Sequence, residues 1–204
     1  MKKKIIQFGA EKIGRSFMGQ LFSANGYEVV FVDIDVTVID AINKKDRYSV
    51  IIKENGKSDT TLPVTNIRRI MGNDIEAVIK ETIDAELIVT SVGKNALPYI
   101  IPTIAAGIIN RLTIKPSAAL NIIFAENMSH GRSVVTTLLA EALKNYAYLL
   151  DNVGIIETSI GKMGSILPKD ITDKNPLFVY GEPYNTFIID KTAFLGKIPD
   201  IPHN

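Results

Sequence analysis

The chain has 204 residues, of which 46% are hydrophobic and 22% charged, which fits a globular protein and excludes a disordered one. Its net charge of +1 gives no reason to expect a nucleic acid or a membrane as partner. Without cysteine, and with only His130 and His203 as histidines, it has no disulfide and no expected metal site. No uninterrupted apolar run approaches the ~18 residues of a membrane span, so we expect a soluble cytoplasmic protein.

Predicted strands and helices alternate along the first three quarters of the chain. Hydrophobic patterning predicts a strand over 4–8, a helix over 13–25, a strand over 28–32, a helix over 37–43, and a hairpin of 48–52 with 60–64. There follow a helix over 75–81, a strand over 87–90, a helix over 98–111, a strand over 121–125 and a helix over 133–147. This order predicts an α/β fold: a Rossmann-like, doubly wound, mainly parallel sheet with helices on both faces.

The last quarter has a different character. Residues 153–160 and 177–189 read as extended, with proline and glycine between them. We therefore expect a dinucleotide-binding core over 1–150 and an extended β segment of the same domain over 151–204. The final residues are linker-like, which leads us to expect that this segment leads to a helical C-terminal domain missing from the chain.

The first expected turn resembles the glycine-rich phosphate loop of a dinucleotide-binding unit. Gly9 suits the tight turn after the strand, and Gly14 lets the helix pack closely on it. A helix N-terminus there attracts an anion such as a pyrophosphate. The residues expected to contact a dinucleotide are Gly9, Ala10, Glu11, Lys12, Ile13 and Gly14. A generic turn of an α/β protein is the alternative interpretation.

Glu11 departs from the G-x-G-x-x-G pattern, because it occupies the position of the middle glycine. A carboxylate ~5 Å from a phosphate costs about 3 kcal/mol per like-charge pair as an upper bound. Lys12 and Arg15 could offset part of this repulsion. Alternatively, Glu11 satisfies the helix terminus itself, which is worth ~0.3–1 kcal/mol.

Acidic and polar residues follow the next expected strands. Asp33 lies about 20 residues after the glycine turn, where a carboxylate accepts hydrogen bonds from the ribose hydroxyls and favours NAD over NADP. Asp35 could share that role, although a solvated aspartate at a loop start is its more ordinary interpretation. Val92 and Gly93 follow the strand 87–90, where a glycine permits close approach of a cofactor or serves only the turn.

The strand 121–125 ends in Glu126 and Asn127. The Asn127 amide could stabilise a substrate oxygen that becomes negative during hydride transfer, and it could also contact the cofactor. A helix cap or turn is the alternative role for this residue type. Glu126 could line the site, and His130 is expected to be a loop residue.

At these residues the chain resembles the polyol-specific long-chain dehydrogenases, in their mannitol-1-phosphate 5-dehydrogenase branch. The matching stretches are Phe8-Gly9-Ala10, Ile13-Gly14-Arg15, Asp33, Thr90-Ser91-Val92-Gly93, Leu120-Asn121-Ile122-Ile123, Glu126-Asn127-Met128, Val153-Gly154, and Ile189-Asp190-Lys191 with Phe194. The resemblance implies an NAD-binding domain of an oxidoreductase that interconverts mannitol 1-phosphate and fructose 6-phosphate. It also implies that Gly9, Gly14 and Asp33 contact NAD and that Asn127 stabilises the substrate oxyanion.

The chain departs from that family at three places. Glu11 replaces the middle glycine, and Ile160-Gly161-Lys162 stands where much of the family has Val-Asp-Arg. The family's catalytic lysine lies in a Lys-x-x-x-x-Asn-x-x-His motif, which no lysine of this sequence matches. Hydride transfer needs a general base on the sugar hydroxyl, and Lys162 is a weak substitute by type. We therefore expect no turnover by this polypeptide alone.

Other functions stay open at this point. The chain could be a non-catalytic Rossmann-shaped protein that has lost NAD and serves binding or regulation. It could also belong to a hexuronate reductase or another polyol dehydrogenase. A sugar phosphate is the expected substrate, and an apolar face left by the missing domain would cause self-association.

Overall fold

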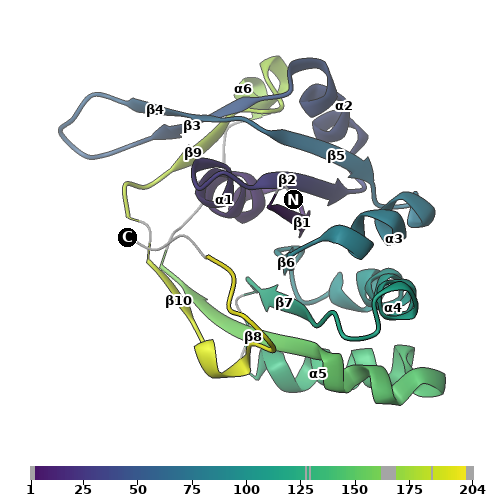
Figure 1. Ribbon diagram of the computed structural model, residues 1–204. Helices are drawn as coiled ribbons and strands as arrows, with labels where there is room; N and C mark the ends of the chain where they lie inside the picture. Colours follow the sequence, from purple (N-terminus) through teal and green to yellow (C-terminus); the bar gives the residue numbers. More distant parts are fainter. Residues whose placement is uncertain (1–2, 127, 129, 162–168, 185, 201–204) are drawn as a thin grey trace.

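The computed structural model describes residues 3–126, 128, 130–161, 169–184 and 186–200 (Figure 1). The strands are β1 (Lys4–Phe8), β2 (Glu28–Asp33), β3 (Tyr48–Ile52), β4 (Thr60–Val64), β5 (Ile67–Met71), β6 (Leu87–Thr90), β7 (Leu120–Phe124), β8 (Val153–Ile160), β9 (Val179–Gly181) and β10 (Phe187–Ile189). They form a seven-stranded sheet in the order β10-β8-β7-β6-β1-β2-β5 and a three-stranded sheet in the order β4-β3-β9.

The helices lie between these strands. They are the π-helix η1 (Gly14–Gly19), α1 (Gln20–Ala24), α2 (Val36–Lys45), α3 (Ile75–Asp84), α4 (Leu97–Ile114), α5 (Gly131–Ala142), the 3-10 helix η2 (Lys144–Asn152), α6 (Lys169–Lys174) and the 3-10 helix η3 (Lys191–Ala193). Asp35 begins α2 by accepting hydrogen bonds from the Thr37 and Val38 amides. Asp74 begins α3 in the same way through the Ala77 amide.

The main sheet has the expected doubly wound topology. Strands β1, β2, β5, β6, β7 and β8 are mutually parallel, and only β10 pairs antiparallel, with β8. The chain runs outward from β1 through β2 to β5, then returns to β6 on the other side of β1 and continues to β8. The carboxyl ends of β1 and β6 therefore form the point where the strand order reverses, the usual ligand site of such sheets.

Successive side chains of the central strand β1 contribute to two separate hydrophobic cores. Ile5 and Ile6 are both fully buried, but they belong to separate hydrophobic clusters because successive side chains point to opposite faces. The Ile5 cluster includes Phe17 of η1 and Val50 of the small sheet. The Ile6 cluster includes side chains of α3, α4 and α5, which cover the other face in Figure 1.

Several elements differ from the sequence expectation. Strand β5 was not predicted, because Arg68 and Arg69 interrupt its apolar pattern, and neither is fully exposed in the structure. The predicted helix over 133–147 ends at Ala142, and Tyr146 within η2 has the non-helical angles φ −138 and ψ 33. The segment 177–189 holds two short strands that join different sheets, β9 beside β3 and β10 beside β8. The predicted hairpin of β3 and β4 is confirmed.

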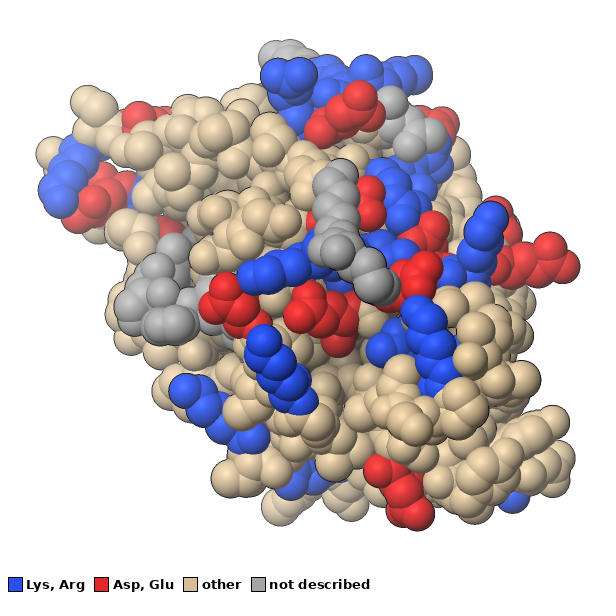
Figure 2. All heavy atoms as spheres, in the orientation of Figure 1, with Lys and Arg blue, Asp and Glu red and all other residues tan. Residues whose placement is uncertain are grey.

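By length and composition alone, α4 is the one helix among the described residues that could cross a membrane. It has a mean hydropathy of 1.3, but half of it is buried inside the protein, as in the core helix of a globular domain. On the face shown in Figure 2, lysine and arginine are interspersed with aspartate and glutamate across the middle of the molecule. That mixed pattern agrees with the small net charge.

Candidate functional site: a pocket where the strand order reverses

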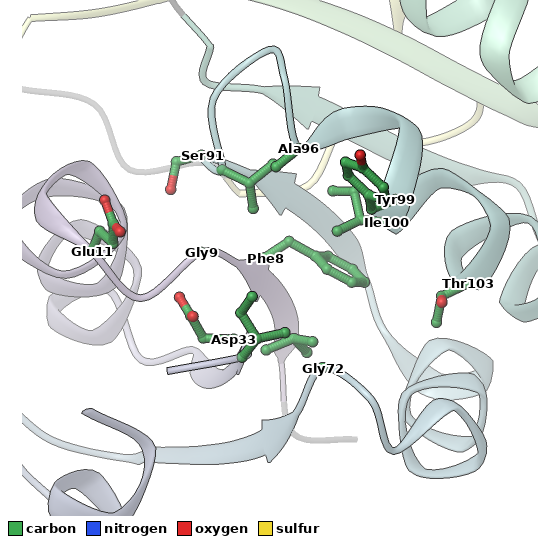
Figure 3. Close-up of a pocket in the computed structure, with 13 residues that line it drawn as sticks. Phe8, Gly9, Glu11, Asp33, Gly72, Ser91, Ala96, Tyr99, Ile100 and Thr103 are labelled. Carbon is green, nitrogen blue, oxygen red and sulfur yellow. The ribbon is translucent and has the colours of Figure 1, made fainter. Parts of the chain in front are cut away.

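A pocket of about 380 Å³ opens at the carboxyl ends of β1, β2 and β6 (Figure 3). The glycine turn forms one wall, and the start of α4 forms the opposite wall. Its lining residues are Phe8, Gly9, Glu11, Val32, Asp33, Ile34, Gly72, Ser91, Val92, Ala96, Tyr99, Ile100 and Thr103. Most of the lining is apolar, with the Asp33 and Glu11 carboxylates at one side, an arrangement typical of small-molecule sites.

Two glycines of the turn are required by close backbone contacts. Gly9 has a φ of +92, and a Cβ there would lie 2.6 Å from the Ser91 carbonyl oxygen. A Cβ on Gly14 would lie 2.0 Å from the Gly9 carbonyl oxygen. The turn therefore packs directly on the loop after β6, and the first helix packs directly on the turn.

Asp33 is held by two backbone amides, one in the glycine turn and one in the loop after β2. Its Oδ2 accepts a hydrogen bond from the Ala10 amide at 2.6 Å, and its Oδ1 accepts one from the Asp35 amide at 3.0 Å. Asp35 itself is committed to the start of α2. Of these two aspartates, Asp33 is therefore the one that lines the pocket.

Arg15 and Tyr48 tie the first helix to the small sheet. Arg15 is only 7% exposed, and it donates to the carbonyl of Ala10 at 2.5 Å and to that of Pro176 at 2.8 Å. The Tyr48 hydroxyl donates to the Arg15 carbonyl at 2.7 Å, and a Cβ on Gly19 would lie 2.4 Å from that hydroxyl. Burial lowers the pKa of Arg15 and raises the pKa of Tyr48, which leaves Tyr48 a neutral donor.

Glu126 fixes the loop after β6. Its two carboxylate oxygens accept hydrogen bonds from the Val92 amide at 2.8 Å and from the Gly93 amide at 2.7 Å. Gly93 has a φ of +81, and a Cβ there would meet no atom within 4 Å. Its glycine is therefore explained by the backbone conformation of this loop.

The structure brings together part of the predicted set. Gly9, Glu11, Asp33 and Val92 line the pocket, while Ala10 and Gly14 support the turn from within. The remaining three lie outside the lining: Ile13 packs against the core, and Lys12 and Gly93 are exposed. Asn127, Lys162 and His203 lie outside the described residues.

About half of the residues that line the pocket were not predicted from the sequence. Gly72 follows the unpredicted strand β5, and Ile34 follows Asp33 directly. Tyr99, Ile100 and Thr103 come from α4, which was predicted as a helix without a role. Their position after the carboxyl ends of parallel strands is the signal that could have identified them.

The whole chain resembles one family. Residues 3–203 match the model of the mannitol dehydrogenase Rossmann domain. The chain belongs to the mannitol dehydrogenase family. The resemblance stated from the sequence is thereby confirmed at the level of the family and its N-terminal domain.

A relative of known name supports this assignment. The chain is 34% identical over 198 residues to the mannitol-1-phosphate 5-dehydrogenase of Brevibacillus brevis, covering 96% of this chain and 50% of that protein. It therefore spans about half the length of this relative.

Two solved structures share the fold. The mannitol 2-dehydrogenase of Pseudomonas fluorescens, a ternary complex with NAD and D-mannitol, has a TM-score of 0.76 at 12% identity over 93% of this chain and 49% of that one. A substrate-free D-sorbitol dehydrogenase has a TM-score of 0.74 at 13% identity over 92% of this chain and 50% of that one. At such low identity these likenesses establish the fold alone.

Proposed function

We propose that this chain is the NAD-binding domain of an oxidoreductase that interconverts mannitol 1-phosphate and fructose 6-phosphate. The observation that carries the proposal is the 34% identity, over 96% of the chain, to a mannitol-1-phosphate 5-dehydrogenase. NAD as the cofactor is supported by the family match and by the NAD complex of mannitol 2-dehydrogenase. A cytoplasmic location and a sugar phosphate substrate belong to the same proposal.

The pocket fits the adenosine part of NAD. Gly9 and Gly14 let the turn pack on the loop after β6 and the first helix pack on the turn, which places the Gly9 backbone at the pocket wall. Asp33 presents a carboxylate at the pocket wall, where it would accept hydrogen bonds from ribose hydroxyls and repel a 2′-phosphate. Bound NAD would supply the hydride acceptor for oxidation of the polyol.

The 204 residues lack the family's lysine motif, so we propose that this polypeptide alone has no turnover. In the proposal, the catalytic lysine comes from a helical C-terminal domain, which corresponds to the half of the relative that this chain does not cover. The extended segment 151–204 would lead into that domain. Asn127 is proposed to contribute its amide to the substrate oxyanion.

Titration with NADH and NADPH tests the cofactor assignment. We expect NADH to bind at least tenfold more tightly than NADPH, and Asp33→Asn to reduce that preference, since the carboxylate is what repels the 2′-phosphate. Equal binding of both cofactors by the parent would contradict the role of Asp33. Oxidation of mannitol 1-phosphate by the purified chain would contradict the absence of turnover.

A second candidate is a non-catalytic Rossmann-shaped protein that has lost NAD and serves binding or regulation. The observation that favours it is Glu11, which lines the pocket at the turn and whose carboxylate forms no hydrogen bond or ion pair among the described residues. A hexuronate reductase or another polyol dehydrogenase is a related enzyme alternative. Failure of NADH to bind either the parent or Glu11→Gly would favour the non-catalytic candidate.

A further inference from the structure

We propose that the pocket selects the uncharged nucleoside part of its ligand, and that phosphate groups weaken binding instead of strengthening it. This inference rests on the proposed function, because it concerns the same pocket beside the glycine turn. It reverses the usual behaviour of such turns, which attract phosphate through a helix N-terminus.

The side chains that line the pocket carry negative charge and no positive charge. Glu11 and Asp33 are the charged residues of its described lining, and that lining contains no lysine, arginine or histidine. Both carboxylates lie beside the Gly9 stretch in Figure 3, Glu11 at the start of the first helix and Asp33 at the end of β2. A phosphate at the turn would therefore meet two negative charges and no cationic side chain of the pocket wall.

Three backbone donors at the pocket, one in the turn and two in the loop after β6, already bind carboxylates of the protein. The Ala10 amide donates to Asp33 at 2.6 Å. The Val92 and Gly93 amides donate to Glu126 at 2.8 and 2.7 Å. A phosphate would have to displace a carboxylate of the protein to use any of these three donors.

Arg15 and Lys12 are the two cations near Glu11 in sequence, and neither side chain lines the pocket. Arg15 is buried, and its guanidinium donates to the carbonyls of Ala10 and Pro176. Lys12 is exposed and does not line the pocket. Neither cation is placed to hold a phosphate against Glu11.

The rest of the pocket suits an uncharged ligand. Phe8, Val32 and Ile100 provide apolar walls. Ile34 and Tyr99 are 77% and 82% exposed at the same pocket, where a flat base could cover them. Asp33 adds an acceptor for ribose hydroxyls without requiring a phosphate.

The test is a calorimetric comparison of adenosine, AMP and ADP, with divalent cations removed by EDTA. In the parent we expect adenosine to bind at least as tightly as AMP and ADP. In Glu11→Gly we expect ADP to bind at least tenfold more tightly than adenosine. Glu11→Gln, which keeps the length of the side chain but removes its charge, should lie between the two. Glu141→Gln, an exposed carboxylate on α5 outside the pocket, should behave like the parent.

Salt provides a second readout. Screening weakens repulsion between exposed charges, so raising the ionic strength should strengthen ADP binding to the parent and weaken it in Glu11→Gly. Tighter binding of ADP than of adenosine by the parent, or the same ligand order in Glu11→Gly, would overturn the inference and leave the NAD proposal standing. If adenosine, ADP and NADH bind none of the variants, the proposed function falls together with the inference.

Discussion

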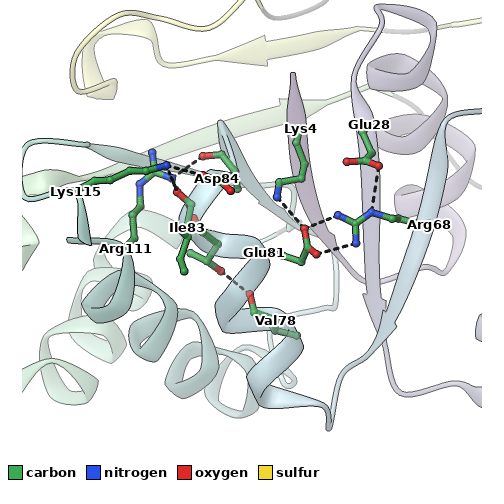
Figure 4. Close-up of polar contacts among 11 residues, drawn as sticks. Lys4, Glu28, Arg68, Val78, Glu81, Ile83, Asp84, Arg111 and Lys115 are labelled. Carbon is green, nitrogen blue, oxygen red and sulfur yellow. Dashed lines mark hydrogen bonds and ion pairs between the residues drawn. The ribbon is translucent and has the colours of Figure 1, made fainter. Parts of the chain in front are cut away.

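The two ends of the main sheet hold their charged side chains in different ways. At the amino end, Lys4, Arg68 and Glu81 meet in a network of opposite charges (Figure 4). At the carboxyl end, Asp33 and Glu126 are held by backbone amides. Paired charges at the amino end contribute to the fold, whereas amide-bound carboxylates at the other end shape the walls of the pocket. The comparison separates residues expected to affect stability from those expected to affect binding.

Arg111 of α4 makes further contacts near the amino end of the main sheet. It is 8% exposed, and its guanidinium donates to five carbonyls, those of Thr82, Ile83, Ala85, Ala118 and Ala119, at 2.8 to 3.2 Å. Three of these carbonyls lie at or just beyond the end of α3, where the helix itself supplies no donors, and that of Ile83 also accepts from Lys115 at 3.2 Å. Arg111 therefore joins α4 to the end of α3 and to the approach of β7.

The largest effect on stability is expected from Arg111→Ala. It would leave buried carbonyls without donors, each costing ~1–3 kcal/mol, so the free energy of unfolding should fall by about 3–5 kcal/mol. Urea unfolding would measure this, with Lys115→Ala as the control. Lys115 pairs with Asp84 at the surface and shares the Ile83 carbonyl with Arg111, which remains as its donor, so the loss should stay below about 1 kcal/mol. Equal losses in the free energy of unfolding for the two variants would contradict the claim that the buried Arg111 contacts stabilise the fold more than the surface contacts of Lys115.

Gly14→Ala should be the most damaging change at the carboxyl end. Its Cβ would overlap the Gly9 carbonyl oxygen, so we expect a loss of about 1–3 kcal/mol in stability and of NADH binding. Gly131→Ala is the matched control, because a Cβ there would approach only the flexible Met128 side chain at 3.3 Å and one Glu157 oxygen at 3.6 Å. Normal NADH binding by Gly14→Ala would show that the turn does not hold the cofactor.

Glu126→Gln should loosen the pocket wall with little effect elsewhere. An amide group presents only one acceptor oxygen, so one of the Val92 and Gly93 amides would face an NH2 group. Exchange of these two amides with deuterated water should speed up about tenfold, equivalent to ~1.4 kcal/mol. Glu157→Gln is the control, because Glu157 accepts from the Arg132 amide instead. Unchanged exchange at Val92 and Gly93 would contradict the role of Glu126.

The smallest effect is a pH dependence from the amino-end network. Burial would raise the pKa of Glu81, but hydrogen bonds from Arg68 and Lys4 outweigh it and hold that pKa below its ordinary value. A lowered pKa contributes stability that is complete above the unfolded value, ~4.3, and is lost as the pH falls through the folded value. Unfolding from pH 6 to 3 should therefore show a shallower acid decline for Glu81→Gln than for the parent. Identical declines would mean that the network does not stabilise the ionised carboxylate.

Local signals in the sequence predicted the turn and much of the sheet. Gly9, Gly14 and Asp33 stand at fixed spacings around two apolar strands, so their placement follows from local structure. Strand β5 was not predicted because the carboxylates that pair with Arg68, those of Glu28 and Glu81, lie 40 and 13 residues away in sequence. The hydrogen bond from Arg15 to the Pro176 carbonyl likewise depends on tertiary packing, and no local sequence pattern indicates it.

The most direct test of the central claim is a calorimetric titration of NADH into the parent chain and into Glu11→Gly. We expect both to bind and the variant to bind more tightly, because a like charge beside the pyrophosphate has been removed. Gly14→Ala serves as the negative control. Absence of NADH binding in both the parent and Glu11→Gly would contradict the claim that this pocket is a dinucleotide site.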